Sequence, residues 1–385
     1  MTDLLTADIA STALAFRGYN VTNLGRSAEL LACEAYHDIV AEELQRFSDI
    51  CTEFVDQPAD LVSSVESGTE LGLQRYAESI ALVVAMEVAQ MRLLSEIHGI
   101  ETSQAQLVFG YSLGELVGIS FGGMFAIDEM IRVPLAMAED SVELAKNITM
   151  GVLFSRGPTI VEDDVQRLCL QITGEGKGTV AISAVLSPNT YLLIGQNATV
   201  QRFKEVMHDL LPQRAHLRAN TNRWPPLHTP IVRQKNIADR ASVMMETISG
   251  GFTPPCPPVL SLATGKMSYD DHSARQILRQ WIDHPQRLWD AIDETLTRGV
   301  ETVVHIGPGP NVIPATFRRL SENVLQQTTG ASLSSLGMRA VSGMVRRPWL
   351  AGLLPANAAL LRAPHVGHII LEDWLVENAP SKLGC

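Results

Sequence analysis

Short apolar runs and long helical patterns alternate along the first part of the chain. The runs at residues 13–16 and 106–109 have the length of buried strands, and a turn follows each of them. The longer segments carry apolar residues at helical spacing, and they span residues 27–50, 70–98, 113–124 and 127–148. Strands that alternate with helices in this way predict an α/β domain built on a mainly parallel sheet.

The pattern changes between residues 149 and 219. Strand-like runs and helical stretches follow one another there in the order β-α-β-β-α-β, the split βαβ pattern. The runs lie at residues 150–155, 179–183, 191–194 and 214–218, and the helical stretches lie at 160–172 and 198–211. After this insertion we expect the parallel sheet to resume at 258–262 and 302–306, with a helical stretch at 272–299.

These patterns predict the fold class and the parts of the chain. We expect an α/β fold with a parallel-sheet, α/β-hydrolase-like core and an inserted ferredoxin-like subdomain. The core comprises residues 1–148 and 220–330, the subdomain 149–219, and a C-terminal extension 331–385. The extension contains Arg346-Arg-Pro-Trp349 and the apolar segment Ile369–Val376. We expect it to form short helices that cap the core or offer a surface to a partner, or to be a decoration without specific function.

Composition and charge exclude several classes of protein. A net charge of −12 disfavours nucleic-acid binding, which needs a basic face. The five cysteines are scattered, odd in number and without a C-x-x-C pair, so we expect no metal site and no disulfide framework. The N-terminal residues lack a basic segment, and the chain has no run of about 18 uncharged apolar residues. We therefore expect no signal peptide, no membrane span and a cytoplasmic location.

The segment Gly110-Tyr-Ser-Leu-Gly114 places a serine between two glycines, after a strand and before a helix. This G-x-S-x-G sequence is the nucleophile elbow, in which a sharp turn lifts the serine hydroxyl out of the sheet. The turn also aims backbone N–H groups at the helix start toward an oxyanion. Ser112 is therefore a candidate nucleophile, although glycine and serine are common in strand-to-helix turns of any kind.

A serine nucleophile needs a base, and the candidate is His228, just after the inserted subdomain. With this histidine the chain resembles the malonyl-CoA:acyl-carrier-protein transacylase family, which includes the acyltransferase domains of polyketide and fatty-acid synthases. The resemblance covers about residues 10–325 and rests on motifs in matching order. Gly110-Tyr-Ser-Leu-Gly-Glu115 resembles G-H-S-x-G-E, Leu227-His-Thr-Pro230 resembles F-H-S-P, Arg279-Gln-Trp-Ile-Asp-His-Pro285 with Trp289 resembles R-Q-L-x-x-P-V-x-W, and His305-Ile-Gly-Pro-Gly-Pro310 resembles E-x-G-P-G.

The resemblance implies a function and a set of catalytic groups. Ser112 would take an acyl group from a thioester, and His228 would act as the general base. A main-chain carbonyl at the position matching Gln280 would orient the histidine, and the backbone N–H groups of Leu113 and Tyr19 would form the oxyanion hole. The partners would be acyl-CoA and acyl carrier protein, in fatty-acid or polyketide biosynthesis. Apart from the CoA or phosphopantetheine thioester that serves as substrate, no cofactor is expected.

The chain departs from the family motifs in its expected substrate pocket. Tyr111 replaces the histidine before the nucleophile, and Tyr19 replaces the glutamine of the early F-P-G-Q-G turn. Leu227, before His228, lies in a segment that varies with substrate. Malonyl-specific members hold the malonyl carboxylate with an arginine, whose position here falls on Met137, unless a shift of one helical turn presents Arg132 instead. We therefore predict that the acyl group is neither malonyl nor methylmalonyl.

Three other functions remain open on the sequence alone. The same serine and histidine could hydrolyse acyl groups from carrier proteins, as an editing thioesterase does. A chain with an altered pocket could also be a non-catalytic module that binds carrier protein. A conventional α/β-hydrolase is disfavoured, because the chain has no HGGG-type oxyanion loop and carries the β-α-β-β-α-β insertion.

Overall fold

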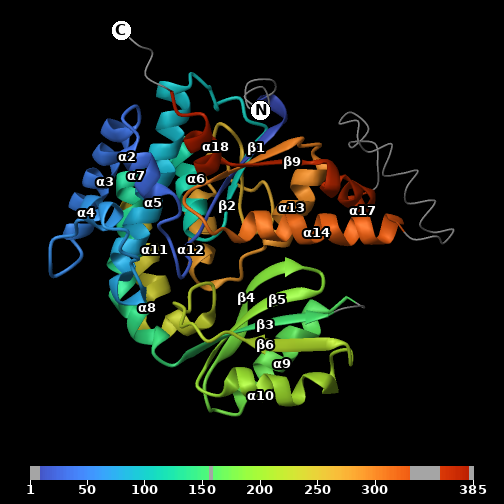
Figure 1. Ribbon diagram of the computed structural model, residues 1–385. Helices are drawn as coiled ribbons and strands as arrows, with labels where there is room; N and C mark the ends of the chain where they lie inside the picture. Colours follow the sequence, from blue (N-terminus) through green and yellow to red (C-terminus); the bar gives the residue numbers. More distant parts are fainter. Residues whose placement is uncertain (1–8, 156–158, 330–355, 381–385) are drawn as a thin grey trace, which may run out of the picture.

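The computed structural model describes residues 9–155, 159–329 and 356–380. The described residues form a larger body around a parallel sheet and a smaller subdomain around an antiparallel sheet, which lies below the body in Figure 1. This arrangement confirms the predicted α/β class with a parallel-sheet core and a ferredoxin-like subdomain.

The main sheet has five parallel strands in the order β7-β2-β1-β8-β9. The strands are β1 (Thr12–Phe16), β2 (Leu107–Gly110), β7 (Val259–Leu260), β8 (Thr302–Ile306) and β9 (Gly367–Ile370). Every residue of β1, β2 and β8 is buried, because helices cover both faces of the sheet. In β1, Leu14 and Phe16 pack into one hydrophobic cluster, and Ala13 and Ala15 pack into the other.

The cluster around Leu14 and Phe16 is the larger one, and most of the helices belong to it. They include α2 (Ser27–Ala32), α3 (His37–Thr52), α4 (Leu61–Glu66), α5 (Tyr76–Arg92), α6 (Leu113–Phe121), α7 (Ile127–Ala136), α8 (Ala138–Ala145), α11 (Ile237–Thr247) and α12 (Ala274–Asp283). The opposite face packs against α13 (Leu288–Thr297), α14 (Val312–Thr329) and α17 (Ala356–Ala359). The nearly uniform burial of α5 agrees with its strongly apolar sequence.

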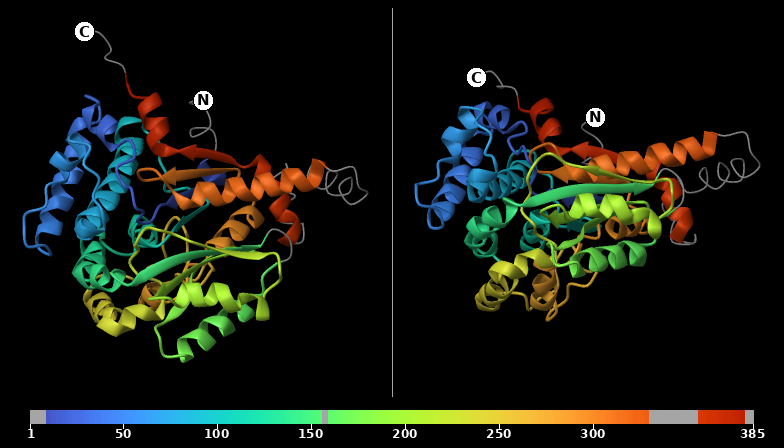
Figure 2. Two further views of the ribbon diagram at one scale, coloured as in Figure 1. Left: turned by 60° about the horizontal axis from the view of Figure 1, so that its bottom comes forward. Right: turned by 90° about the horizontal axis from the view of Figure 1, so that it is seen from below.

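The subdomain has four antiparallel strands in the order β4-β5-β3-β6. The strands are β3 (Ile148–Ser155), β4 (Val180–Ser187), β5 (Thr190–Gln196) and β6 (Ala215–Ala219), with α9 (Glu162–Gly174) and α10 (Thr199–Val206) between them in the sequence. Figure 2 shows both helices on one face of this sheet. Side chains alternate along β5, so Leu193 packs under the helices while Leu192 and Ile194 face the main body.

The C-terminal part differs from the sequence-based expectation. Ala356–Ala359, Leu360–His365 and Leu371–Glu377 (α18) form short helices, as expected, but Gly367–Ile370 is strand β9, which extends the main sheet beside β8. The pattern is misleading because the strand is short and runs directly into the helix, so its apolar residues continue the helical spacing. The segment Arg346–Trp349 lies outside the described residues. Among the described helices, none is long and apolar enough to cross a bilayer.

Candidate active site

The turn between β2 and α6 places Ser112 in a backbone conformation that few residues adopt. Its φ of 56° and ψ of −115° lie outside the regions favoured by L-residues, as expected at a nucleophile elbow. The flanking glycines make the turn possible. A Cβ atom on Gly110 would collide with the backbone of Gly114, and a Cβ atom on Gly114 would collide with the backbone of Phe16 and Arg17. The G-x-S-x-G pattern is therefore required here by close backbone packing.

His228 lies directly against this serine. Its Nε2 atom is 2.6 Å from Ser112 Oγ, and its Nδ1 atom is 2.7 Å from the carbonyl oxygen of Trp281. Burial lowers the pKa of His228 to about 4, so the ring is neutral at pH 7. The Nδ1–H group then donates to the carbonyl of Trp281, which leaves the Nε2 lone pair to accept the serine proton. This is the tautomer that a general base needs.

The prediction that the orienting carbonyl belongs to Gln280 is wrong. That carbonyl accepts the backbone N–H of His284, whereas the carbonyl of Trp281, one residue later in the last turn of α12, faces His228. The family motif R-Q-L-x-x-P has four residues between its arginine and its proline, and this chain has five between Arg279 and Pro285. Counting back from the proline gives Trp281, so the extra residue explains the error.

Two further side chains fix the backbone of the elbow, and the sequence analysis missed both. The Gln286 side-chain oxygen accepts the backbone N–H of Ser112 at 2.9 Å, and Trp281 Nε1 donates to the Ser112 carbonyl at 2.9 Å. Gln286 is fully buried. The only signal for it was that a polar residue follows Pro285 where the motif has valine. Together with Gly110 and Gly114, these contacts hold the strained turn in one conformation.

Glu115 supports the elbow from the other side of α6. Its carboxyl group accepts hydrogen bonds from the Tyr269 hydroxyl at 2.9 Å and the Leu262 backbone N–H at 3.2 Å. Burial raises the pKa of Glu115 to about 7. These contacts tie α6 to the segment that follows β7, and Glu115 does not line the cavity around Ser112.

The predicted oxyanion-hole donors lie on the two loops beside the nucleophile. Leu113 begins α6, and Tyr19 belongs to the turn after β1, whose Gly18 packs against the Tyr111 carbonyl and Ser112 Cβ. Neither the Leu113 N–H nor the Tyr19 N–H has an acceptor among the described residues. Both donors are therefore available to a ligand, and their role stays a prediction.

The cavity beside Ser112 and His228, which we call the acyl pocket, has a volume of about 180 Å³. Four of its walls are aromatic, and the face of the subdomain sheet that points toward the main body supplies aliphatic ones; these residues are Tyr19, Tyr76, Tyr111, Trp224, Met150, Leu192 and Ile194. Leu227 also lines it, as expected. No Lys, Arg, Asp or Glu of the described chain does so. The pocket is therefore uncharged and mainly apolar.

Met137 does not line the acyl pocket, which corrects the sequence-based placement. It lies between α7 and α8, is only 4% exposed and packs in the core behind Tyr76 and Leu227. Arg132, the alternative cation, forms hydrogen-bonded ion pairs with Glu53 on the surface. Tyr76 thus closes the side of the pocket on which the arginine was expected. The sequence does not reveal this role, because Tyr76 begins a helix whose apolar pattern indicates only a core position.

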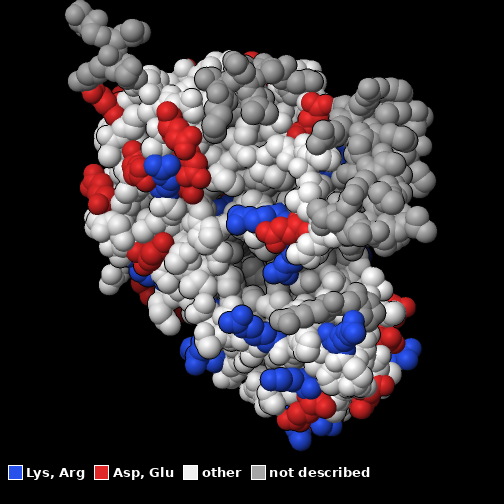
Figure 3. All heavy atoms as spheres, turned by 45° about the vertical axis from the view of Figure 1, so that its right-hand side comes forward, with Lys and Arg blue, Asp and Glu red and all other residues white. Residues whose placement is uncertain are grey.

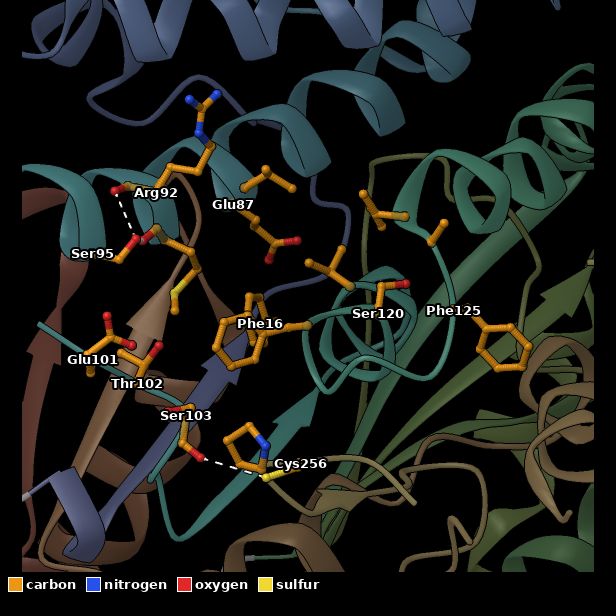
Figure 4. A pocket seen from close by; sticks show the side chains of 17 residues that line it. Phe16, Glu87, Arg92, Ser95, Glu101, Thr102, Ser103, Ser120, Phe125 and Cys256 are labelled. Carbon is orange, nitrogen blue, oxygen red and sulfur yellow. Dashed lines mark hydrogen bonds between the residues drawn. The ribbon is translucent and has the colours of Figure 1, made fainter. Parts of the chain in front are cut away.

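A larger cavity, of about 500 Å³, lies between α5, α6 and the segments before β2 and β7. Figure 4 shows Glu87 and Phe16 on its walls, with Cys256 at one end. The Glu87 carboxylate accepts the backbone N–H of Arg17 at 2.8 Å, and burial raises the pKa of Glu87 well above its usual value. Neither Ser112 nor His228 lines this cavity. The arrangement of reactive groups, and not the size of the cavity, therefore identifies the candidate site.

Known proteins share both sequence and structure with this chain. No protein-family model matches it. The polyketide synthase GfsA of Streptomyces halstedii is 24% identical over 304 residues, which is 77% of this chain but only 4% of the synthase.

Solved structures with the same fold include FabD of Acinetobacter baumannii, with a TM-score of 0.65, 20% identity and coverage of 80% of this chain and 91% of that one. An acyl carrier protein S-malonyltransferase of Vibrio cholerae gives a TM-score of 0.66 at 19% identity, over 80% of this chain and 93% of that one. The acyltransferase domain from the second module of the salinomycin polyketide synthase gives a TM-score of 0.62 at 22% identity, over 79% of this chain and 65% of that one. These likenesses confirm the predicted resemblance: the chain has the fold of the malonyl-CoA:acyl carrier protein transacylases and of the polyketide synthase acyltransferase domains.

Proposed function

We propose that the protein transfers an acyl group from an acyl-CoA or acyl carrier protein to a carrier-protein thiol, through an ester on Ser112, in a fatty-acid or polyketide type of biosynthesis. The observation that carries the proposal is the 2.6 Å contact between Ser112 Oγ and Nε2 of a buried, neutral His228. The transacylase fold and the strained elbow around this pair support the same reaction.

In this proposal each group has one step. His228 Nε2 accepts the proton of Ser112 as the serine oxygen attacks the thioester carbonyl carbon. The backbone N–H groups of Leu113 and Tyr19 donate to the oxyanion, and the Trp281 carbonyl stabilises the imidazolium through Nδ1–H. The C–S bond then breaks, and the imidazolium returns the proton to the leaving sulfur. A carrier-protein thiol attacks the ester in the second half-reaction, with the same transfers in reverse.

The acyl group in this proposal is uncharged. A free carboxylate in the acyl pocket would find no cation on its described walls, and a buried carboxylate without a partner costs several kcal/mol. Aromatic and aliphatic walls favour a hydrocarbon chain instead. The position of Arg132 supports this assignment, because its guanidinium group is paired with Glu53 outside the pocket.

A third cavity, next to the acyl pocket, offers a route for the thioester arm. It lies between α14 and the β4–β5 turn, and it shares Val312 with the acyl pocket. Arg319 lines it and forms no ion pair with any described residue, so its guanidinium group is free to pair with the phosphate of a phosphopantetheine or CoA arm. Figure 3 shows Lys and Arg side chains on both sides of the hollow between the main body and the subdomain.

Intact-mass measurement tests the proposed function. The protein is incubated with uncharged acyl-CoAs and with malonyl-CoA, and the ester on Ser112 is followed before and after addition of a phosphopantetheinylated carrier protein. We expect an uncharged acyl adduct that is absent in Ser112→Ala and that moves to the carrier protein. Release as free acid without transfer would assign a hydrolase instead. The absence of any adduct and any turnover would refute acyl transfer, and preferential loading of malonyl would refute the uncharged acyl group.

A further inference from the structure

A small cavity lies behind the inner wall of the acyl pocket. It has a volume of about 10 Å³, and Val133, Met137 and Ile237 are among its walls. Of the residues that line it, only Tyr76 and Leu227 also line the acyl pocket. These two side chains therefore form the partition between the two spaces.

The partition is held in place from both sides. The Tyr76 ring packs edge-on against Tyr19, with 4.8 Å between the ring centroids, and Tyr76 is only 4% exposed at the start of α5. Leu227 precedes His228, whose backbone N–H donates to the Ile282 carbonyl at 2.6 Å. Movement of the Leu227 backbone would therefore disturb the base, whereas Tyr76 forms no hydrogen bond with Ser112 or His228. Of the two, Tyr76 is the residue whose replacement leaves the hydrogen bonds of Ser112 and His228 in place.

The space behind the partition accepts only hydrocarbon. Apart from Tyr76, the one residue with a hydroxyl group on its walls is Ser141, which donates to the Met137 carbonyl at 2.8 Å and is thereby satisfied. The other walls are apolar side chains and a proline on α7, with Trp281 and Ile282 from α12. An acyl chain that passed the partition would continue into this core without meeting a charge.

Resting on the proposed acyl transfer, we propose that Tyr76 is the specificity-determining residue of the acyl pocket. Together with Leu227 it ends the pocket, so that Ser112 accepts short apolar acyl groups and excludes longer ones. Tyr76 acts by its bulk, since its ring fills the passage from the acyl pocket toward Met137.

A chain-length profile tests this role. Wild type, Tyr76→Phe, Tyr76→Leu and Tyr76→Ala are each incubated with acetyl-, butyryl-, hexanoyl-, octanoyl- and decanoyl-CoA, and the rate of ester formation on Ser112 is measured by intact mass. Because one methylene in an apolar pocket is worth roughly 10–200-fold in discrimination, we expect Tyr76→Ala to raise the rate with the first excluded chain length at least tenfold. Tyr76→Phe keeps the ring and should keep the wild-type limit. Tyr76→Leu provides a folded, intermediate variant if loss of the whole ring prevents folding.

A double-mutant cycle with Met137 separates the partition from a general loosening of the core. Met137→Ala enlarges only the space behind the partition, so it should leave the chain-length limit unchanged while Tyr76 is present. In the Tyr76→Ala or Tyr76→Leu background the same change should extend the limit further, which is a non-additive result. A Met137→Ala variant that accepts longer chains on its own would overturn the proposal.

The outcomes distinguish the proposal from the function on which it rests. Equal chain-length limits in wild type, Tyr76→Leu and Tyr76→Ala, with short esters still formed on Ser112, would overturn the role of Tyr76 alone. Failure of all folded variants, wild type included, to form an ester with any of the five thioesters would overturn the proposed function.

Discussion

The reactive centre and the acyl pocket lie side by side, yet they are built in different ways. At the reactive centre, backbone contacts fix the geometry: two glycines that admit no Cβ, two carbonyls at the end of α12 and the hydrogen bonds that hold Ser112. The acyl pocket is instead made of side chains from the main body and from the subdomain sheet. The chemistry can therefore stay constant in this fold while the pocket changes.

The difference shows in what each region tolerates. A residue that collides with backbone leaves no room for adjustment, whereas a pocket wall such as Tyr76 or Trp224 can be replaced at the cost of local repacking. Changes at the reactive centre should thus abolish the reaction, and changes in the pocket should redirect it.

The largest expected effect comes from removing the base. His228→Ala should lower the rate of ester formation about 10^4-fold or more, because no other described group lies within hydrogen-bond reach of Ser112 Oγ as a base. Single-turnover kinetics with an uncharged acyl-CoA measure this. A His228→Ala variant within tenfold of wild type would assign the base elsewhere.

The elbow glycines give the next largest effect. Gly114→Ala would drive a methyl group into the backbone of Phe16 and Arg17, so the turn must shift. Overpacking of this kind costs about 1–3 kcal/mol in the free energy of unfolding. A displacement of the nucleophile by about 1 Å costs on the order of 10²-fold in rate.

Gly174→Ala is the matched control for the elbow. Gly174 ends α9 in the subdomain, and no atom lies within 4 Å of a Cβ built there. This variant should keep wild-type activity and stability in the same assays. Full activity of Gly114→Ala would show that the backbone of the elbow can shift to accommodate the methyl group without displacing Ser112.

The sequence predicted the parts of the site that follow from local backbone rules. Gly110, Ser112 and Gly114 form a contiguous motif, and the split βαβ pattern of the subdomain is local as well. The roles of Gln286 and Tyr76 were not predicted, because each residue acts through a contact with an element distant in the sequence. Strand β9 was not predicted for the same reason: its pairing with β8 joins residues more than 60 positions apart.

A pH dependence of stability should come from the buried base. The pKa of His228 is about 4 in the folded protein and about 6.5 in an unfolded chain, so between these values the unfolded state binds more protons. The contribution of His228 to the free energy of unfolding should therefore be constant above pH 6.5 and fall by roughly 3 kcal/mol as the pH drops toward 4. Chemical denaturation at a series of pH values measures this, with His228→Gln, which has no proton to gain, as the comparison. Equal slopes in both proteins would contradict a lowered pKa.

The smallest expected effect concerns Arg132, and it tests whether the pocket is truly without a cation. Its guanidinium group pairs with Glu53 at 2.9 Å across partly exposed surface, far from the walls of the acyl pocket. Arg132→Gln should cost at most about 0.5–1 kcal/mol in the free energy of unfolding, as exposed ion pairs do. It should also leave the ratio of ester-formation rates with malonyl-CoA and butyryl-CoA within twofold of wild type. A loss of malonyl loading specific to this variant would mean that Arg132 reaches the acyl pocket. The pocket would then contain a fixed polar group, as the reactive centre does, and would not be uncharged.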